Sequence, residues 1–137
     1  MIYIHIYTRF LWLLFYFYPD LNIQVGVLGL GLMGSQLATR LINAGYHISI
    51  YNRSNEKTKQ FEKLGVRMAR SPAALAEDCD FLLICVTEFE AVKKVCFETD
   101  GIIAANHKDL VVADSSTISP EQSKYNEALR RNEIEML

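Results

Sequence analysis

The sequence predicts an α/β protein built around a doubly wound parallel sheet, and three features of residues 22–137 lead to this prediction. Short apolar runs alternate with stretches in which apolar residues recur at helical spacing. The connections between them are short, which favours right-handed crossovers between parallel strands. The run FLLICV at 81–86 is apolar throughout, as expected of a central strand that helices cover on both faces.

The elements follow one another in a regular order. The sequence predicts helices at 33–44 and 55–64 and strands at 22–28, 47–51, 66–69, 81–86 and 110–113. Gly45 and Gly65 follow the two helices, as is usual at helix C-termini. Ser71 and Pro72 begin the next helix, with serine as the cap and proline at the first helical position.

The second half continues this alternation. Thr87 and Glu90 have the spacing of a capping box for a helix that reaches Cys96. Residues 119 and 120, again serine and proline, predict the start of a last helix to about Arg131. Residues 133–137 would open one more strand, so we expect the sheet to be incomplete at its C-terminal end.

Residues 1–20 differ from the rest in composition. Eight of the fifteen aromatic residues fall within the first eighteen positions, where Arg9 is the only Arg, Lys, Asp or Glu. The uninterrupted apolar run there, 10–18, is far shorter than the roughly 20 residues that a spanning helix needs, so a membrane-spanning helix is not expected. Three interpretations remain: a weak membrane-surface anchor, a segment packed on the domain or a partner, or upstream sequence translated from a misplaced start. We favour the third, and divide the chain into an apolar extension at 1–20 and a folded domain at 21–137.

The net charge and the cysteine content limit the kinds of ligand and site that we expect. The net charge of −2 gives no nucleic-acid footprint. The cysteines, Cys79, Cys85 and Cys96, are odd in number and lack CxxC spacing, so we expect neither a disulfide framework nor a metal site. Reduced thiols in a cytoplasmic protein are the expectation, with Cys85 buried inside its apolar run.

A glycine loop follows the first strand and opens the first helix. Its residues, Gly29, Leu30, Gly31, Leu32, Met33 and Gly34, match the pattern GxGxxG. Within a βαβ unit this pattern is typical of Rossmann-type dinucleotide-binding folds. The first glycine permits a tight turn, the second lets the pyrophosphate approach and the third permits close helix–strand packing, while the helix N-terminus offers free N–H groups. A structural turn without a ligand is the alternative.

The end of the second strand distinguishes between cofactors. NAD-binding domains usually place Asp or Glu there, to bind the ribose 2′-hydroxyl. This sequence has Asn52, which offers no carboxylate, and Arg53, which can pair with a 2′-phosphate. Ser54 can add a hydrogen bond and Lys57 a positive charge, although a helix cap and a solvated face also account for them. The pattern favours NADP over NAD.

Four segments resemble the β-hydroxyacid dehydrogenase family, which includes 3-hydroxyisobutyrate dehydrogenase, tartronate semialdehyde reductase and relatives of 6-phosphogluconate dehydrogenase. They are GLGLMG, NRS with Lys57, SPAALAEDCD and above all DSSTISP at 114–120. The resemblance covers about 22–137, the cofactor-binding domain. It implies an oxidoreductase that transfers hydride between NADP(H) and a small hydroxyacid or semialdehyde.

The resemblance also implies individual contacts. Cys85 and Val86 would lie against the ribose and nicotinamide side of the cofactor, Thr117 would approach the nicotinamide ribose, and Ser116 would bind the substrate. A strand-to-helix loop that satisfies its own backbone groups is the alternative for Ser116 and Thr117. Family members often carry Asn or a small polar residue near Glu90, and here the capping box accounts for the carboxylate.

In the family the general acid/base is a lysine on a helix beyond the cofactor domain. No glycine follows Gly101 to form its motif, and Lys124 comes too early in the sequence. We therefore expect a fragment that lacks the substrate domain and is inactive alone. Two hypotheses remain: the cofactor domain of an active reductase, or a catalytically inert dinucleotide-binding module. The substrate and the oligomeric state stay open.

Overall fold

The computed structural model describes residues 22–107, 109–115 and 125–137. Six strands form one sheet in the order β3-β2-β1-β4-β5-β6, and all neighbours are parallel. The strands are β1 (Gln24–Leu28), β2 (His47–Tyr51), β3 (Arg67–Met68), β4 (Phe81–Ile84), β5 (Val111–Asp114) and β6 (Glu135–Met136). This is the strand order of a doubly wound Rossmann fold, so the predicted fold class is confirmed.

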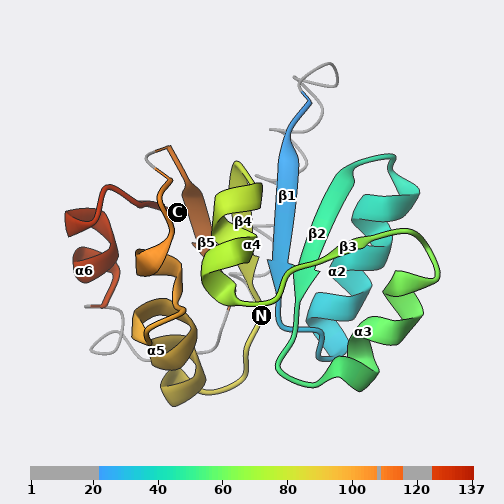
Figure 1. The fold of residues 1–137 in the computed structure, drawn as a ribbon, viewed down its shortest axis with the longest axis horizontal. Coiled ribbons are helices and arrows are strands. Elements are labelled where there is room, and N and C mark those ends of the chain that lie inside the picture. Colours follow the sequence, from blue (N-terminus) through green and yellow to red (C-terminus); the bar gives the residue numbers. More distant parts are fainter. Residues whose placement is uncertain (1–21, 108, 116–124) are drawn as a thin grey trace, which may run out of the picture.

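Helices connect the strands and cover both faces of the sheet. They are α2 (Leu32–Asn43), α3 (Asn55–Glu62), α4 (Pro72–Asp78), α5 (Phe89–Phe97) and α6 (Tyr125–Arg131), with a 3₁₀ turn η1 (Ile102–Ala104) after α5. Figure 1 shows β1 in the middle, with β2 and β3 on one side and β4 and β5 on the other. The chain therefore reverses its direction of winding between β1 and β4, where doubly wound sheets bind ligands.

Two apolar cores lie on opposite faces of the sheet because successive side chains of a strand point to opposite sides. Leu82 and Ile84 of β4 belong to the core beneath α4, α5 and α6. Leu83 belongs to the other core, with Ala38 of α2 and Phe61 of α3. The uninterrupted apolar sequence of β4 is thus explained by burial on both faces, as predicted.

The helix boundaries confirm one predicted start and correct another. Ser71 caps α4 as expected, because its hydroxyl accepts a hydrogen bond from the Ala74 N–H at 3.1 Å. The predicted capping box of Thr87 and Glu90 is wrong. The cap of α5 is Glu88, so Glu90 is the second helical residue and not the third, and its side chain is out of register with the cap. Glu90 instead pairs with Lys93 at 2.6 Å.

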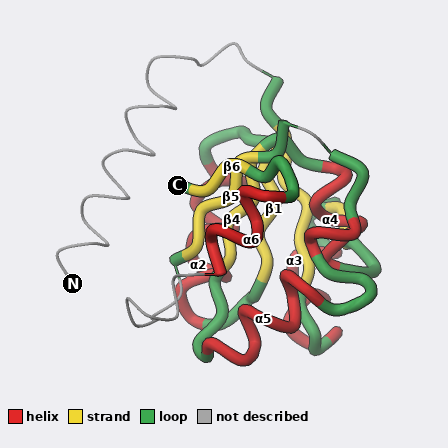
Figure 2. Tube along the Cα trace, turned by 90° about the vertical axis from the view of Figure 1, so that its left-hand side faces the viewer, coloured by secondary structure: helices red, strands yellow, loops and turns green. Residues whose placement is uncertain are grey.

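The strand suggested by residues 133–137 is present as β6. It is two residues long and pairs with β5 at the edge of the sheet. Figure 2 shows the C-terminus beside this strand. The serine and proline at 119 and 120, predicted to start the last helix, lie outside the described residues, and α6 is described from Tyr125.

Candidate dinucleotide site at the carboxyl edge of the sheet

Four strands end together at one edge of the sheet. Leu28 of β1 is in register with Tyr51 of β2 and with Ile84 of β4, and Ile84 with Asp114 of β5. The backbone ladder continues one residue further, with the Gly29 N–H donating to the Tyr51 carbonyl at 2.9 Å. The loops after these strands are therefore brought side by side at the point where the winding reverses.

The three glycines of the first loop have different surroundings. Gly29 has φ +95°, and a Cβ there would lie 2.3 Å from the Cys85 carbonyl oxygen. A Cβ at Gly34 would lie 1.8 Å from the Gly29 carbonyl oxygen, so helix α2 approaches the loop more closely than any side chain permits. A Cβ at Gly31 would meet nothing within 4 Å. Two glycines thus allow the backbone to pack, and the third faces open space.

That open space adjoins the N-terminus of α2. Gly31 is the N-cap residue and has no side chain to cap the helix, and the first turn contains no acidic residue. The first intrahelical bond runs from the Ser35 N–H to the Gly31 carbonyl at 2.9 Å. The N–H groups of the preceding turn lack intrahelical acceptors and carry the positive end of the helix dipole, which is an arrangement suited to an anion.

Asn52 connects the loop after β2 to the glycine loop. Its Oδ1 accepts a hydrogen bond from the Leu30 N–H at 2.9 Å, and its Nδ2 donates to the Ser54 carbonyl at 2.9 Å. Leu30 is buried, so this backbone N–H depends on the asparagine. The sequence indicated only that Asn52 lacks a carboxylate, and the structure shows that it also holds the glycine loop in place.

The residues after Asn52 present cationic and hydroxyl groups to solvent. Arg53 and Lys57 are exposed, and neither forms an ion pair with any residue in the described ranges. Ser54 has the backbone position of the N-cap of α3, but its side chain makes no capping hydrogen bond. Glu56 in the same turn is the opposing charge.

A hollow of about 190 Å³ lies beside this loop. One wall comes from the ends of β1 and β2, with Arg53, and the other from the start of α5. Its lining residues are Leu28, Gly29, Tyr51, Asn52, Arg53, Val86, Glu88, Glu90, Ala91, Lys94 and Val95. The lining of the hollow therefore combines apolar and charged residues.

Cys85 and Val86 were predicted to end the central strand, whereas β4 ends at Ile84 and both residues lie directly after it. Cys85 is buried, in agreement with the prediction, and burial raises the pKa of its thiol. The Ser115 hydroxyl donates to the Ile84 carbonyl at 2.8 Å and lies 3.2 Å from the Cys85 Sγ. Ser116 and Thr117, the predicted substrate and ribose contacts, lie outside the described residues.

An aromatic cluster of Tyr125, Phe89 and Phe97 packs beside the end of β5. The Tyr125 hydroxyl donates a hydrogen bond to the carboxylate of Asp114, the last residue of β5. The Tyr125 ring packs against Phe89 and Phe97 of α5, with centroids 6.0 and 6.4 Å apart. Burial, followed by the neighbouring Asp114, raises the pKa of Tyr125 well above its usual value. The cluster thereby joins the end of β5 to the helix that walls the hollow.

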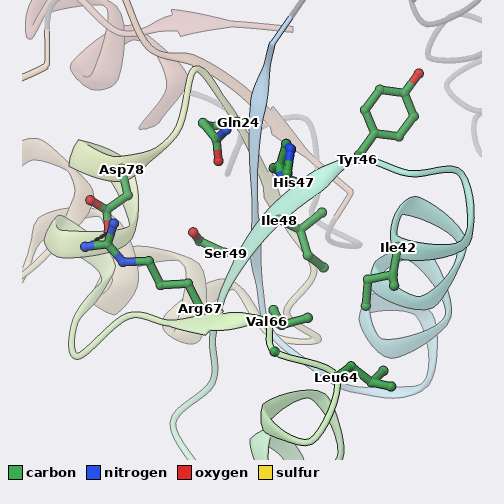
Figure 3. A pocket seen from close by; sticks show the side chains of 11 residues that line it. Gln24, Ile42, Tyr46, His47, Ile48, Ser49, Leu64, Val66, Arg67 and Asp78 are labelled. Carbon is green, nitrogen blue, oxygen red and sulfur yellow. Dashed lines mark ion pairs between the residues drawn. The ribbon is translucent and has the colours of Figure 1, made fainter.

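A larger hollow, of about 300 Å³, lies at the opposite edge of the sheet. Gln24, His47 and Arg67, the first residues of three strands, line it. Figure 3 shows Arg67 reaching toward Asp78 of α4, with which it pairs at 2.9 Å. Although larger, this hollow lies at the amino ends of the strands and has neither the glycine loop nor a free helix N-terminus beside it.

The described part of the chain lacks two classes of feature. No group of three or more His, Cys, Asp or Glu side chains could hold a metal ion there. No helix among the same residues is long and apolar enough to cross a membrane.

Sequence reasoning identified one wall of the hollow and missed the other. Arg53 was found from the second strand, whereas Glu88, Ala91 and Val95 of the α5 segment were not expected to line a site. Their signal is the helical spacing of 88, 91 and 95, which places them on one face of the connection that follows β4. Ligands in doubly wound sheets lie between the connections after β1 and β4, so the sequence alone could have predicted that this face lines the site.

Comparisons with known proteins agree with this geometry. The family model described as the NAD binding domain of 6-phosphogluconate dehydrogenase matches residues 24–137. The "Cytokine-like nuclear factor N-PAC" of Xenopus tropicalis is 34% identical over 98 residues, which are 72% of this chain and 18% of that protein. The "Probable 3-hydroxyisobutyrate dehydrogenase-like 3, mitochondrial" of Arabidopsis thaliana is 33% identical over 121 residues, 84% of this chain and 38% of that protein.

Among solved structures, "Psf3 in complex with NADP+ and 2-OPP" is 30% identical with a TM-score of 0.76, and the match covers 82% of this chain and 40% of that one. An imine reductase from Myxococcus stipitatus in complex with NAD+ has the same TM-score at 17% identity, over 85% of this chain and 40% of that one, and shows the fold alone. The chain thus spans well under half the length of these relatives. The match along residues 24–137 shows that the chain belongs to the family of the NAD-binding domain of 6-phosphogluconate dehydrogenase.

Proposed function

We propose that the carboxyl edge binds NADP, with the pyrophosphate on the glycine loop. The single observation that carries this proposal is the space above Gly31, where a Cβ would meet nothing within 4 Å, directly beside the uncapped N-terminus of α2. Unpaired N–H groups and a helix dipole favour two phosphates at this point, and no acidic residue of the first turn opposes them.

The residues after β2 select the phosphorylated cofactor in this proposal. Arg53 and Lys57 supply positive charge, and the Ser54 hydroxyl makes no capping bond and is available to a phosphate oxygen. Asn52 replaces the acidic residue that would bind an unmodified ribose, and its amide is already engaged with Leu30 and Ser54. The hollow beside Arg53 would receive the adenine, stacked against the guanidinium.

The whole protein, in this proposal, is an oxidoreductase that transfers hydride between NADP(H) and a small hydroxyacid or semialdehyde. The Arabidopsis relative is named as a probable dehydrogenase of this kind, and the Psf3 structure is described with NADP+. Cys85, Val86 and Thr117 would face the nicotinamide side, and Ser116 the substrate. The buried thiols fit a reducing compartment such as the cytoplasm.

A second function is an inert dinucleotide-binding module. The N-PAC relatives, which match 72% of the chain, are named as nuclear factors and not as enzymes. Both functions require NADP binding, and only the first requires turnover. The two functions are distinguished by mixing the longest natural form of the protein with NADPH and a panel of small semialdehydes. Loss of NADPH absorbance supports the oxidoreductase, and unchanged absorbance supports the inert module.

The cofactor assignment is tested by titrating NADP and NAD separately. We expect the wild type to bind NADP more tightly, and Arg53→Asp to weaken NADP by about 10- to 100-fold because a charge-assisted phosphate contact becomes a repulsion. Arg130→Asp, at an exposed position on α6, is the matched control and should change neither affinity. A wild-type preference for NAD, or a preference unaffected by Arg53→Asp, contradicts the proposal.

A further inference from the structure

The hollow that we assign to adenine has carboxylates on its rim, which is unexpected next to an anionic dinucleotide. Glu88 and Glu90 line it from the start of α5, together with the cations Arg53 and Lys94. Neither carboxylate contributes to the pyrophosphate or 2′-phosphate contacts proposed above. Negative charge at this position opposes the binding of an anion, so a compensating contact with the base would account for it.

The two carboxylates are in different situations. Glu90 pairs with Lys93 at 2.6 Å, and the Lys93 ammonium also lies 5.2 Å from the centre of the Phe89 ring. Its charge is therefore compensated within the helix. Both glutamate side chains are exposed, so the ion pair with Lys93 is what distinguishes Glu90 from Glu88.

Glu88 has no such partner among the described residues. It is the N-cap of α5, with extended backbone angles of φ −129° and ψ 143°, and its side chain makes no capping hydrogen bond. Its backbone carbonyl begins the helix by accepting from the Val92 N–H at 3.1 Å. The backbone of Glu88 is thus fixed, while its exposed side chain lines the hollow and forms no ion pair with the described residues.

We propose that the Glu88 carboxylate accepts a hydrogen bond from the 6-amino group of the purine and thereby selects adenine over a 6-oxo base. This inference rests on the proposed function, because it needs the dinucleotide in the hollow. Arg53 on one wall and Ala91 with Val95 on the other leave the base edge to the polar rim. An ionised carboxylate is an acceptor only, so an amino group satisfies it and a carbonyl oxygen repels it.

The test compares NADP with nicotinamide hypoxanthine dinucleotide phosphate, in which oxygen replaces the 6-amino group and N1 carries a proton. We expect the wild type to bind NADP about tenfold more tightly or better, the range typical of one hydrogen bond to a charged group. Glu88→Gln should reduce this ratio to about threefold or less, because an amide can donate to the 6-oxo group as well as accept from the 6-amino group.

Two further variants show which carboxylate is responsible. Glu90→Gln should keep the wild-type ratio, because the Glu90 charge is engaged by Lys93. Glu98→Gln, beyond the last turn of the same helix and outside the hollow, should keep both the ratio and the affinities. A ratio that collapses in Glu90→Gln and not in Glu88→Gln would overturn the assignment.

The remaining outcomes separate this inference from the proposed function. Equal affinities of the wild type for the two dinucleotides refute the role of Glu88 while leaving NADP binding intact. A Glu88→Gln variant that weakens both ligands equally indicates a contact with the ribose and also refutes it. Absence of NADP binding by the wild-type chain refutes the proposed function, and the inference with it.

Discussion

Alanine substitutions at Gly31 and Gly34 separate the binding role of the glycine loop from its packing role. At Gly34 an added Cβ would lie 1.8 Å from the Gly29 carbonyl oxygen and 3.1 Å from the Cys85 Cβ. The backbone oxygen has no rotamer by which to move away. The helix must therefore shift by about 1.2 Å, the difference between 1.8 Å and the 3.0 Å below which real Cβ contacts are essentially never seen.

At Gly31 the same methyl group meets nothing, and φ of −67° suits any residue. We expect Gly34→Ala to cost about 1–3 kcal/mol, as overpacking of a dense region does, and to lower Tm by at least about 4 °C. Gly31→Ala should change stability by less than about 1 kcal/mol, because the small loss at the cap offsets the lower entropy of the unfolded chain.

For ligand binding, we expect the larger direct effect from Gly31→Ala. Gly31→Ala fills the space that we assign to the pyrophosphate and should weaken NADP by about tenfold or more, since backbone can no longer approach the phosphates. Thermal unfolding followed by circular dichroism, together with calorimetric titration, measures both quantities. A Gly34→Ala protein as stable as the wild type refutes the steric argument. A Gly31→Ala protein that binds NADP normally refutes the position of the pyrophosphate.

Two other predictions concern Asn52 and the cysteines. Asn52→Ala should destabilise the chain by about 1–3 kcal/mol because the buried Leu30 N–H loses its acceptor, whereas Asn52→Asp should retain most stability and shift the cofactor preference toward NAD. Equal unfolding midpoints for the two variants in urea would contradict this. Burial raises the pKa of the Cys79 and Cys96 thiols from 9.0 to about 12. Their contribution to stability is full below pH 9 and is lost as the pH rises toward 12, on the order of 1 kcal/mol per thiol by pH 10. Urea unfolding of the wild type and of Cys79→Ala at pH 8 and at pH 10 measures this loss, and an equal loss of stability in the two proteins would contradict the burial argument.

The order of strands and helices could be predicted because it depends on local patterns. The apolar period, the glycines after helices and the cap at Ser71 are read within a few residues of one another, and the structure confirms them. The capping box at Thr87 and Glu90 failed because a shift of one residue in the helix start changes which side chain faces the cap. Side-chain spacing alone does not fix that register.

The same distinction between local pattern and tertiary packing holds for the candidate site. The sequence by itself determined the glycine loop, the absence of a carboxylate after the second strand and the cations that follow it, because these are identities at fixed offsets within one βαβ unit. Only the tertiary structure decided that Asn52 holds the Leu30 N–H, that Gly34 must lack a Cβ because of the Gly29 carbonyl, and that Glu88 and Arg53 line the same hollow. The last of these joins segments more than thirty positions apart in the sequence. They meet because β4 returns beside β1, and pairing between distant strands is set by the packing of the whole sheet and not by any local pattern.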